Sequence, residues 1–182
     1  MLGTRLLLRS TAVLGLLSLA SVASAAPQCT SITGGNTTAS AISDCDACTT
    51  LYPTRAIDGD TGSSAQVLVA ANVSGRNGVR ATAQRGIVYP AGSRPGAVIK
   101  LTEGASVAMN TRGVLRTYLN GRLQNQQVFD AGTTDVNAVG SLSGLKSLKA
   151  TKPFNAVEVV FDGTYTGYLI EVFELCSDSR VR

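Results

Sequence analysis

The chain has 182 residues, of which 44% are hydrophobic, 15% are charged and 5% are aromatic, and it contains neither histidine nor tryptophan. Without histidine, Ser-His-Asp and Cys-His catalysis are impossible and the commonest general base is missing. The formal net charge is +4. The few aromatic residues and the lack of a nucleic-acid-binding motif argue against nucleic acid as a partner.

The first residues predict a secretory signal peptide over residues 1–25. Arg5 and Arg9 precede the apolar run Thr11–Val22, and Ala23-Ser24-Ala25 provides a small-x-small cleavage pattern. The apolar run is shorter than the roughly 20 residues of a membrane-spanning helix. We therefore expect a secreted, extracellular protein with one domain over residues 26–182 and no stable membrane insertion.

The charges that remain after cleavage are unevenly distributed. The segment 26–182 has 14 basic and 12 acidic residues, but the stretch Arg55–Arg122 has nine basic residues against Asp58, Asp60 and Glu103. A basic middle can contact an acidic polysaccharide or a membrane surface. Arginines scattered over the outward faces of strands are the simpler interpretation, because no dense basic run exists.

The four cysteines fit an oxidising compartment. Cys29, Cys45, Cys48 and Cys176 allow three pairings. Cys45-Asp46-Ala47-Cys48 is a C-x-x-C motif, but no thioredoxin-like alternation of strand and helix surrounds it, so a structural bridge is favoured over redox chemistry. A zinc site is disfavoured because the fourth cysteine is remote.

The first half of the expected domain reads as strands. Gln66–Val73 is a compact apolar run typical of a buried strand, and Val79–Tyr89 alternates, with Gly86 at a position that suits a bulge. Ala97–Leu101 predicts a further strand.

The second half gives the clearest local signal. Gly113–Phe129 contains two alternating runs around Asn120-Gly121, the pair that best adopts a type I′ hairpin turn. Gly140–Lys149 is the one place where a short helix is expected. Phe154–Phe161 and Tyr165–Leu175 predict two late strands with a turn between them. Short strands at this spacing predict an all-β fold, an antiparallel β-sandwich or jelly roll.

Three features of the chain resemble a known group of secreted sandwiches. Cys29 lies close to the expected mature start, Ala56-Ile57-Asp58-Gly59-Asp60 follows, and the chain ends on the strand Ile170–Cys176. These features resemble the galactose-binding-like domains, which include discoidin domains, the C domains of coagulation factors and related carbohydrate-binding modules. The resemblance implies the disulfides Cys29–Cys176 and Cys45–Cys48.

The acidic loop is a candidate calcium site. Calcium prefers six to eight oxygen ligands from carboxylates and carbonyls, and Asp58, Asp60 and the Thr61 hydroxyl lie together around a glycine. The resemblance implies a further carboxylate from Glu171 or Glu174. Strand alternation predicts that these two glutamates point to opposite faces, so only one of them can serve. An Asp-Gly turn with solvated carboxylates is the open alternative.

Four residues are candidates for ligand contact. Arg76, Arg80 and Arg94 lie in or beside glycine-rich turns and can bind carboxylates or sulfates in a bidentate manner, and Tyr89 offers a hydroxyl-bearing aromatic ring. The resulting hypothesis is a non-enzymatic module that binds a glycan or another cell-surface component. The alternative is a structural or matrix protein without a small-ligand site.

Asp60-Thr61-Gly62-Ser63-Ser64 also matches the catalytic loop of aspartic peptidases. Such enzymes need two carboxylates that share a proton, and the chain contains no second Asp-Thr-Gly or Asp-Ser-Gly. An exported peptidase is therefore a remote alternative.

Overall fold

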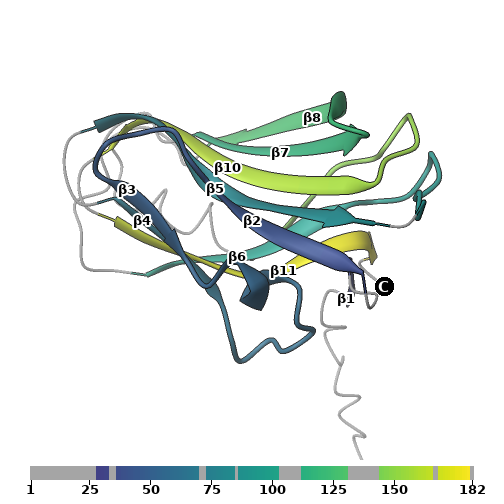
Figure 1. Cartoon of the computed structure of the whole chain (residues 1–182), viewed down its shortest axis with the longest axis horizontal. Coiled ribbons are helices and arrows are strands. Elements are labelled where there is room, and N and C mark those ends of the chain that lie inside the picture. The colour runs from purple at the N-terminus through teal and green to yellow at the C-terminus, as the bar shows by residue number, and fades with distance from the viewer. Residues whose placement is uncertain are drawn as a thin grey trace, which may run out of the picture.

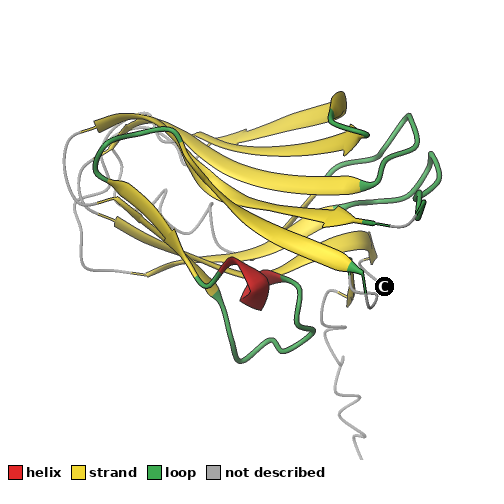
Figure 2. Cartoon of the chain, in the orientation of Figure 1, coloured by secondary structure: helices red, strands yellow, loops and turns green. Residues whose placement is uncertain are grey.

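The protein is a two-layered antiparallel β-sandwich. The computed structural model describes residues 28–32, 36–69, 73–84, 86–102, 112–130, 144–165 and 168–180. Within these ranges the strands form two stacked sheets, and the only helical element is the short 3₁₀ turn η1, Pro53–Ala56 (Figure 1, Figure 2). The expected all-β sandwich is confirmed. The expected signal peptide lies outside the described residues.

One sheet has five strands in the order β2-β5-β10-β7-β8. Its strands are β2 (Thr37–Ser43), β5 (Val73–Ala83), β10 (Ala156–Tyr165), β7 (Arg112–Leu119) and β8 (Arg122–Asp130). All neighbours are antiparallel, and β10 pairs with β5 on one side and β7 on the other. The central strand β10 therefore brings together residues that are far apart in the sequence. Arg80 and Glu158, which pair across β5 and β10, are 78 positions apart.

The second sheet is organised around β11. Its path is β3-β4-β11-β6-β9, and β1 also pairs with β11. Its strands are β1 (Gln28–Ser31), β3 (Cys48–Leu51), β4 (Ala65–Val69), β6 (Gly96–Thr102), β9 (Gly144–Ser147) and β11 (Tyr168–Arg180). Figure 1 shows β1 beside the C-terminal end of the chain.

The core lies between the sheets and follows the period-two alternation of the strands. Val157, Val159 and Phe161 of β10 belong to it, as do Ile170 and Val172 of β11. The core is rich in alanine and valine, and its largest fully buried side chains are Phe154 and Phe161.

Both disulfides implied by the sequence resemblance are present. Cys29–Cys176 joins β1 to β11 with a Cα–Cα distance of 5.3 Å, and Cys45–Cys48 closes the turn between β2 and β3 with a distance of 5.4 Å. The first bridge ties the two ends of the described chain together. The second closes the point where the chain passes from the five-stranded sheet to the other.

Local turn chemistry predicts the hairpin correctly. β7 and β8 flank Asn120 and Gly121, whose φ angles are +49° and +80°. Both values lie in the left-handed region that a type I′ turn requires.

Three expectations from the sequence are wrong. The stretch 162–164 is not a turn, because β10 continues to Tyr165 and pairs with β5 along its whole length. Gly144–Ser147, in the segment expected to be helical, is a strand that pairs with the edge of β6. The expected strand Val79–Tyr89 ends at Ala83, and Tyr89 forms only an isolated bridge with Phe154. In each case pairing with a distant strand overrides the local pattern.

In the described part of the chain, no helix has the length and apolar character needed to cross a membrane.

We expect the two disulfides to differ strongly in their contribution to stability. Cys29–Cys176 spans 147 residues and Cys45–Cys48 spans three. Because loop-closure entropy grows with loop length, removing the first with paired serines should cost about 3–5 kcal/mol, and removing the second about 2 kcal/mol or less. Urea unfolding of the two double-serine variants measures this. Equal losses of unfolding free energy, or a larger loss from removing the short bridge, would contradict the idea that Cys29–Cys176 stabilises the fold by joining its two ends.

Candidate functional site

A cluster of arginines covers the outward face of the five-stranded sheet. Val157 and Val159 point into the core, so alternation places the intervening Glu158 on the opposite face. Arg80 of β5 and Arg116 of β7 pair with Glu158 on either side. Four residues further along the strands, Arg76, Asp162 and Arg112 form a second row of the same kind. We call Arg76, Arg80, Arg112, Arg116, Tyr118, Glu158 and Asp162 the arginine face.

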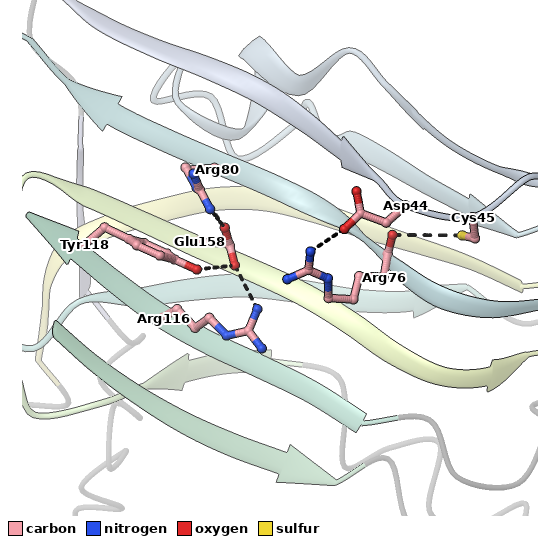
Figure 3. A network of polar contacts seen from close by, with 7 residues as sticks. All are labelled: Asp44, Cys45, Arg76, Arg80, Arg116, Tyr118 and Glu158. Atoms are coloured by element: carbon pink, nitrogen blue, oxygen red, sulfur yellow. Dashed lines mark hydrogen bonds and ion pairs between the residues drawn. The ribbon is translucent and has the colours of Figure 1, made fainter. Parts of the chain in front are cut away.

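Glu158 is the centre of a dense polar network (Figure 3). Its carboxylate accepts hydrogen bonds from Arg80 Nε at 2.7 Å and also from Arg80 Nη2, from Arg116 Nη1 at 3.1 Å and from the Tyr118 hydroxyl at 3.0 Å. Glu158 is 1% exposed. A carboxylate so far from water needs charged and hydrogen-bonding partners, and here two guanidiniums supply the counter-charge while the phenol adds a hydrogen bond.

The Tyr118 ring also supports the arginine above it. The Arg80 guanidinium carbon lies 4.3 Å from the centre of the Tyr118 ring, within cation–π range. Burial raises the pKa of Tyr118, and the adjacent Glu158 raises it further. The hydroxyl therefore stays protonated at neutral pH and keeps donating to Glu158.

The second row is more open to solvent. Arg112 Nε lies 3.6 Å from Asp162 Oδ1, with the Arg112 side chain 60% exposed. Arg76 forms an ion pair with Asp44, which follows β2, and this hydrogen bond is the main reason that the pKa of Arg76 is raised. Figure 3 shows the Arg76–Asp44 pair beside the Glu158 network, on the same side of the sheet.

Apolar residues between the two rows are buried although none of the described strands or helices covers them. Val160 is 0% exposed and Val114 is 3% exposed, and both face outward beside Gly78. Arginine stems are long enough to lie over apolar surface while the charged head stays in water. Within the described residues, the arginines of the two rows are the long side chains that flank these valines on the outward face.

The arginine face can bind oxygen-rich ligands. A guanidinium has five N–H donors, and Arg80 uses only its Nε and Nη2 atoms on Glu158 in the part of the chain described. The remaining N–H donors of Arg80 belong to a guanidinium whose position is fixed by these bonds. Such preorganised guanidiniums suit carboxylates, sulfates and hydroxyls.

The four ligand residues expected from the sequence separate into two pairs. Arg76 and Arg80 belong to the arginine face. Tyr89 is instead stacked on Phe154 at a centroid distance of 5.2 Å, and burial raises its pKa. Arg94 is exposed, and its backbone N–H donates to Asp178. The structure does not bring the second pair to the arginine face.

Four members of the arginine face were not predicted from the sequence as site residues: Glu158, Arg112, Arg116 and Tyr118. One signal was present, since Glu158 is the only charged residue in the apolar run Val157–Phe161. The partners of Glu158 could not be identified, because they depend on the register of three strands that are far apart in sequence.

The acidic loop forms a compact turn that is stabilised by its own side chains. Asp58 accepts from the Ser63 hydroxyl at 2.6 Å and from the Asp60 backbone N–H at 2.9 Å. The Ser63 bond is the main cause that lowers the pKa of Asp58. Asp60 accepts from the backbone N–H of Gly62 at 2.8 Å, while Thr61 is exposed.

Both late glutamates face this loop, so the expectation that they lie on opposite faces is wrong. Ile170, Val172 and Leu175 point into the core, because a bulge between Val172 and Glu174 interrupts the alternation. Glu171 accepts from the Ser64 hydroxyl at 3.1 Å, and Glu174 accepts from the Ser31 hydroxyl.

Glu174 is the glutamate that approaches the turn itself. It is 3% exposed, and burial raises its pKa. The charge of Asp58 raises that pKa further, whereas bonds from Ser31 and the Gly59 backbone lower it. Among the residues that the structure describes, no three acidic, cysteine or histidine side chains converge as a metal cluster would. The donors present, two carboxylates with a hydroxyl and backbone carbonyls, are nevertheless the oxygen ligands that calcium takes.

An exposed aromatic residue lies just before the acidic loop. Tyr52 is 52% exposed and has a left-handed backbone, with φ of +53°. Arg55 holds its guanidinium 4.3 Å from the centre of the Tyr52 ring. A non-glycine residue in this backbone region is uncommon, so the turn presents this ring at the cost of some strain.

No protein-family model and no curated protein matches the chain. The similar solved structures include the family 32 carbohydrate-binding module from C. perfringens NanJ in complex with galactose, with 16% identity, a TM-score of 0.47 and coverage of 80% of this chain and 96% of the module. A chitosan-binding module of a Paenibacillus sp. IK-5 chitosanase/glucanase has 17% identity, a TM-score of 0.44 and coverage of 78% and 93%.

An arabinose-bound GH51 α-L-arabinofuranosidase is similar with 17% identity and a TM-score of 0.47, over 78% of this chain and only 22% of the enzyme. These similarities include carbohydrate-binding modules, the class that the sequence resemblance indicated. With TM-scores below 0.5, they do not decide the ligand, and the functional argument depends on the residues of this chain.

We expect Glu158→Gln to lower the free energy of unfolding by about 2–3 kcal/mol, because the change leaves the partly buried Arg80 and Arg116 without a counter-charge. Asp44→Asn is the matched control. It makes the same chemical change in an ion pair whose side chains are about half exposed, and it should cost less than about 1 kcal/mol. Urea unfolding at neutral pH compares them. Similar costs for the two variants would show that Glu158 does not organise the face.

Proposed function

We propose that this protein is a secreted, non-enzymatic module that binds a glycan carrying acidic groups, and that the arginine face is its binding surface. One observation supports the proposal above the others. On a sheet face where the described residues place no covering strand or helix, Glu158 is almost fully buried and is held between two guanidiniums.

The charge of the surface favours an acidic over a neutral ligand. The arginine face has four arginines against Glu158 and Asp162, and Asp44 pairs with Arg76 at its margin. The surface therefore retains a positive excess while its acidic groups are already engaged. Rows four residues apart on a strand are separated by about 13 Å, so a saccharide of several rings is needed to contact both rows together.

The alternatives receive less support from the arrangement. In a purely structural protein, apolar residues could shield Val160 and Val114 from water without burying a charge. A buried ion-pair network is therefore not needed for structure alone. For a peptidase, the Asp60 carboxylate lies in an exposed turn and is engaged with its own loop. A peptidase dyad requires two carboxylates close enough to share a proton.

A glycan array tests the proposed function, with Arg76→Gln/Arg112→Gln as the probe variant. Both side chains are at least half exposed, so their loss should spare the fold. Each charged hydrogen bond contributes about 1.5–3 kcal/mol, and we expect at least about tenfold weaker binding to sulfated or uronate-containing glycans.

The control is Arg94→Gln/Arg122→Gln, which removes the same charge from exposed residues outside the arginine face. It should bind like the parent protein. Equal losses of glycan affinity in both variants would show that the effect comes from net charge and not from the arginine face. No saturable binding to any glycan would favour the structural alternative.

We also propose that calcium binds at the acidic turn, held by Asp58, the Ser63 hydroxyl and Glu174, with backbone carbonyls of the loop. Bound calcium would neutralise the buried Glu174 and fix the loop against β11. Without calcium, a glutamate whose folded pKa is raised favours folding below its unfolded pKa, and that contribution is lost as the pH rises through its folded pKa.

We expect calcium at about 100 times its dissociation constant to add about 2.7 kcal/mol of stability, which corresponds to about 5–10 °C in Tm. Glu174→Gln should lose this increase. Without calcium, Glu174→Gln should be at least as stable as the parent above the folded pKa, because it removes a buried charge. Thermal unfolding in CaCl₂ and in EDTA measures both effects. An increase that survives in Glu174→Gln, or no increase in the parent, would contradict the site.

A further inference from the structure

A second candidate site lies at the edge of the sandwich, away from the arginine face. β8 is the edge strand of the five-stranded sheet and β9 is the edge strand of the other. A cavity of about 240 Å³ opens between them, lined by Leu115, Gln127, Phe129, Leu145, Lys146 and Ser147. Its volume is below the roughly 300–1,000 Å³ of clefts for drug-sized ligands, so it suits a ligand built on a single ring.

Polar residues stand in this cavity where a sandwich would normally place core residues. Lys146 pairs with Ala97 and Gln127 pairs with Leu115, and both partners belong to the core. Antiparallel partners point to the same face of a sheet. The registers therefore place a lysine and a glutamine on the core-facing side of their sheets, at the open edge where Gln127 is exposed and Lys146 is half-buried.

Lys146 is held in an environment that is partly shielded from water. Its ammonium lies 5.9 Å from the centre of the Phe129 ring, and burial lowers the pKa of Lys146. A desolvated ammonium beside an aromatic ring attracts an anionic group strongly, because the local dielectric constant is lower than in bulk water.

Phe129 and Gln127 supply the remaining elements of a binding site. The Phe129 ring lies directly against Gly113, where an added Cβ would come within 1.9 Å of the ring, and it meets Phe161 edge-on at 6.4 Å. Its position is therefore fixed. Nearby Asn125 donates to the Thr117 hydroxyl at 3.0 Å, whereas the Gln127 amide makes no such bond in the described chain and is open to a ligand.

We propose that this cavity binds one sugar ring that carries a carboxylate, such as a uronic acid. Lys146 pairs with the carboxylate, Gln127 hydrogen-bonds the ring hydroxyls, and Phe129 and Leu115 contact the apolar side of the ring. The site is separate from the arginine face, because its residues point into the interior while those of the arginine face point outward. The proposal deepens the proposed glycan binding but uses none of the same residues.

The test is an NMR titration of the isotope-labelled full chain with galacturonic acid and, separately, with galactose. We expect saturable shifts at Gln127, Phe129 and Lys146 with galacturonic acid, and at least about tenfold weaker binding of galactose, which lacks the charge. Equal affinity for the two sugars would overturn the assignment of the ligand class. No saturable shift at these residues would overturn the site.

Lys146→Met keeps the length of the stem and removes the charge, and Lys149→Met is the matched control at an exposed position. Lys146→Met should weaken galacturonic acid binding at least about tenfold, and Lys149→Met should not change it. Equal effects would overturn the role of Lys146. If Lys146→Met does not fold, Gln127→Leu at an exposed position must weaken binding of both sugars instead. Shifts confined to the arginine face would overturn the cavity and leave the proposed function intact.

Discussion

A carboxylate buried on a sheet face that no described element covers sets the main constraint on this molecule. Glu158 lies at the centre of the five-stranded sheet, and its burial requires positive partners from both neighbouring strands. Arg80, Arg116 and Tyr118 meet that requirement only if β5, β10 and β7 keep one register. A shift by one residue would turn Glu158 into the core. The same interaction therefore specifies the register of the sheet and fixes the guanidiniums that a ligand would contact.

The two faces of the five-stranded sheet differ in chemistry, since one is apolar and the other is charged. The inward face packs small apolar residues against the second sheet, and the outward face carries a layer of ion pairs between arginines and acidic residues. Replacing such a layer by apolar residues is often neutral or stabilising, so stability does not explain why it is charged. A surface of fixed guanidiniums has a clear use in binding, and that is the physical basis of the proposed function. The acidic turn and the edge cavity, for which separate roles are proposed, lie elsewhere on the sandwich.

The fold could be predicted from the sequence where local chemistry decides it. Asn120-Gly121 dictates its own hairpin, and the alternation of Val157–Phe161 indicates a strand. The terminal disulfide followed from the resemblance to known domains, and no spacing argument could have selected it. The short strands β1, β2 and β3 were missed, because four to seven residues rich in threonine and serine have little apolar periodicity.

The candidate sites were less predictable because they depend on register and on irregularities of the strands. One bulge after Val172 moved Glu174 to the same side as Glu171, and no feature of a single sequence reports a bulge reliably. Arg76 and Arg80 were found as ligand candidates because glycines surround them. Their partners Glu158 and Arg116 come from other strands. Arg94, in a similar glycine-rich context, lies elsewhere, so that context does not by itself mark a site.

The most direct test of the account is to map the bound saccharide on the protein. We would titrate the isotope-labelled chain with a uronate-containing oligosaccharide and follow the arginine Nε–H and backbone N–H signals. The account predicts that the largest changes fall on Arg76, Arg80, Arg112 and Arg116, and that raising the salt concentration weakens them together. Saturable binding that changes only the loops around Tyr52 and Arg94, and leaves the arginines of β5 and β7 unaffected, would contradict it.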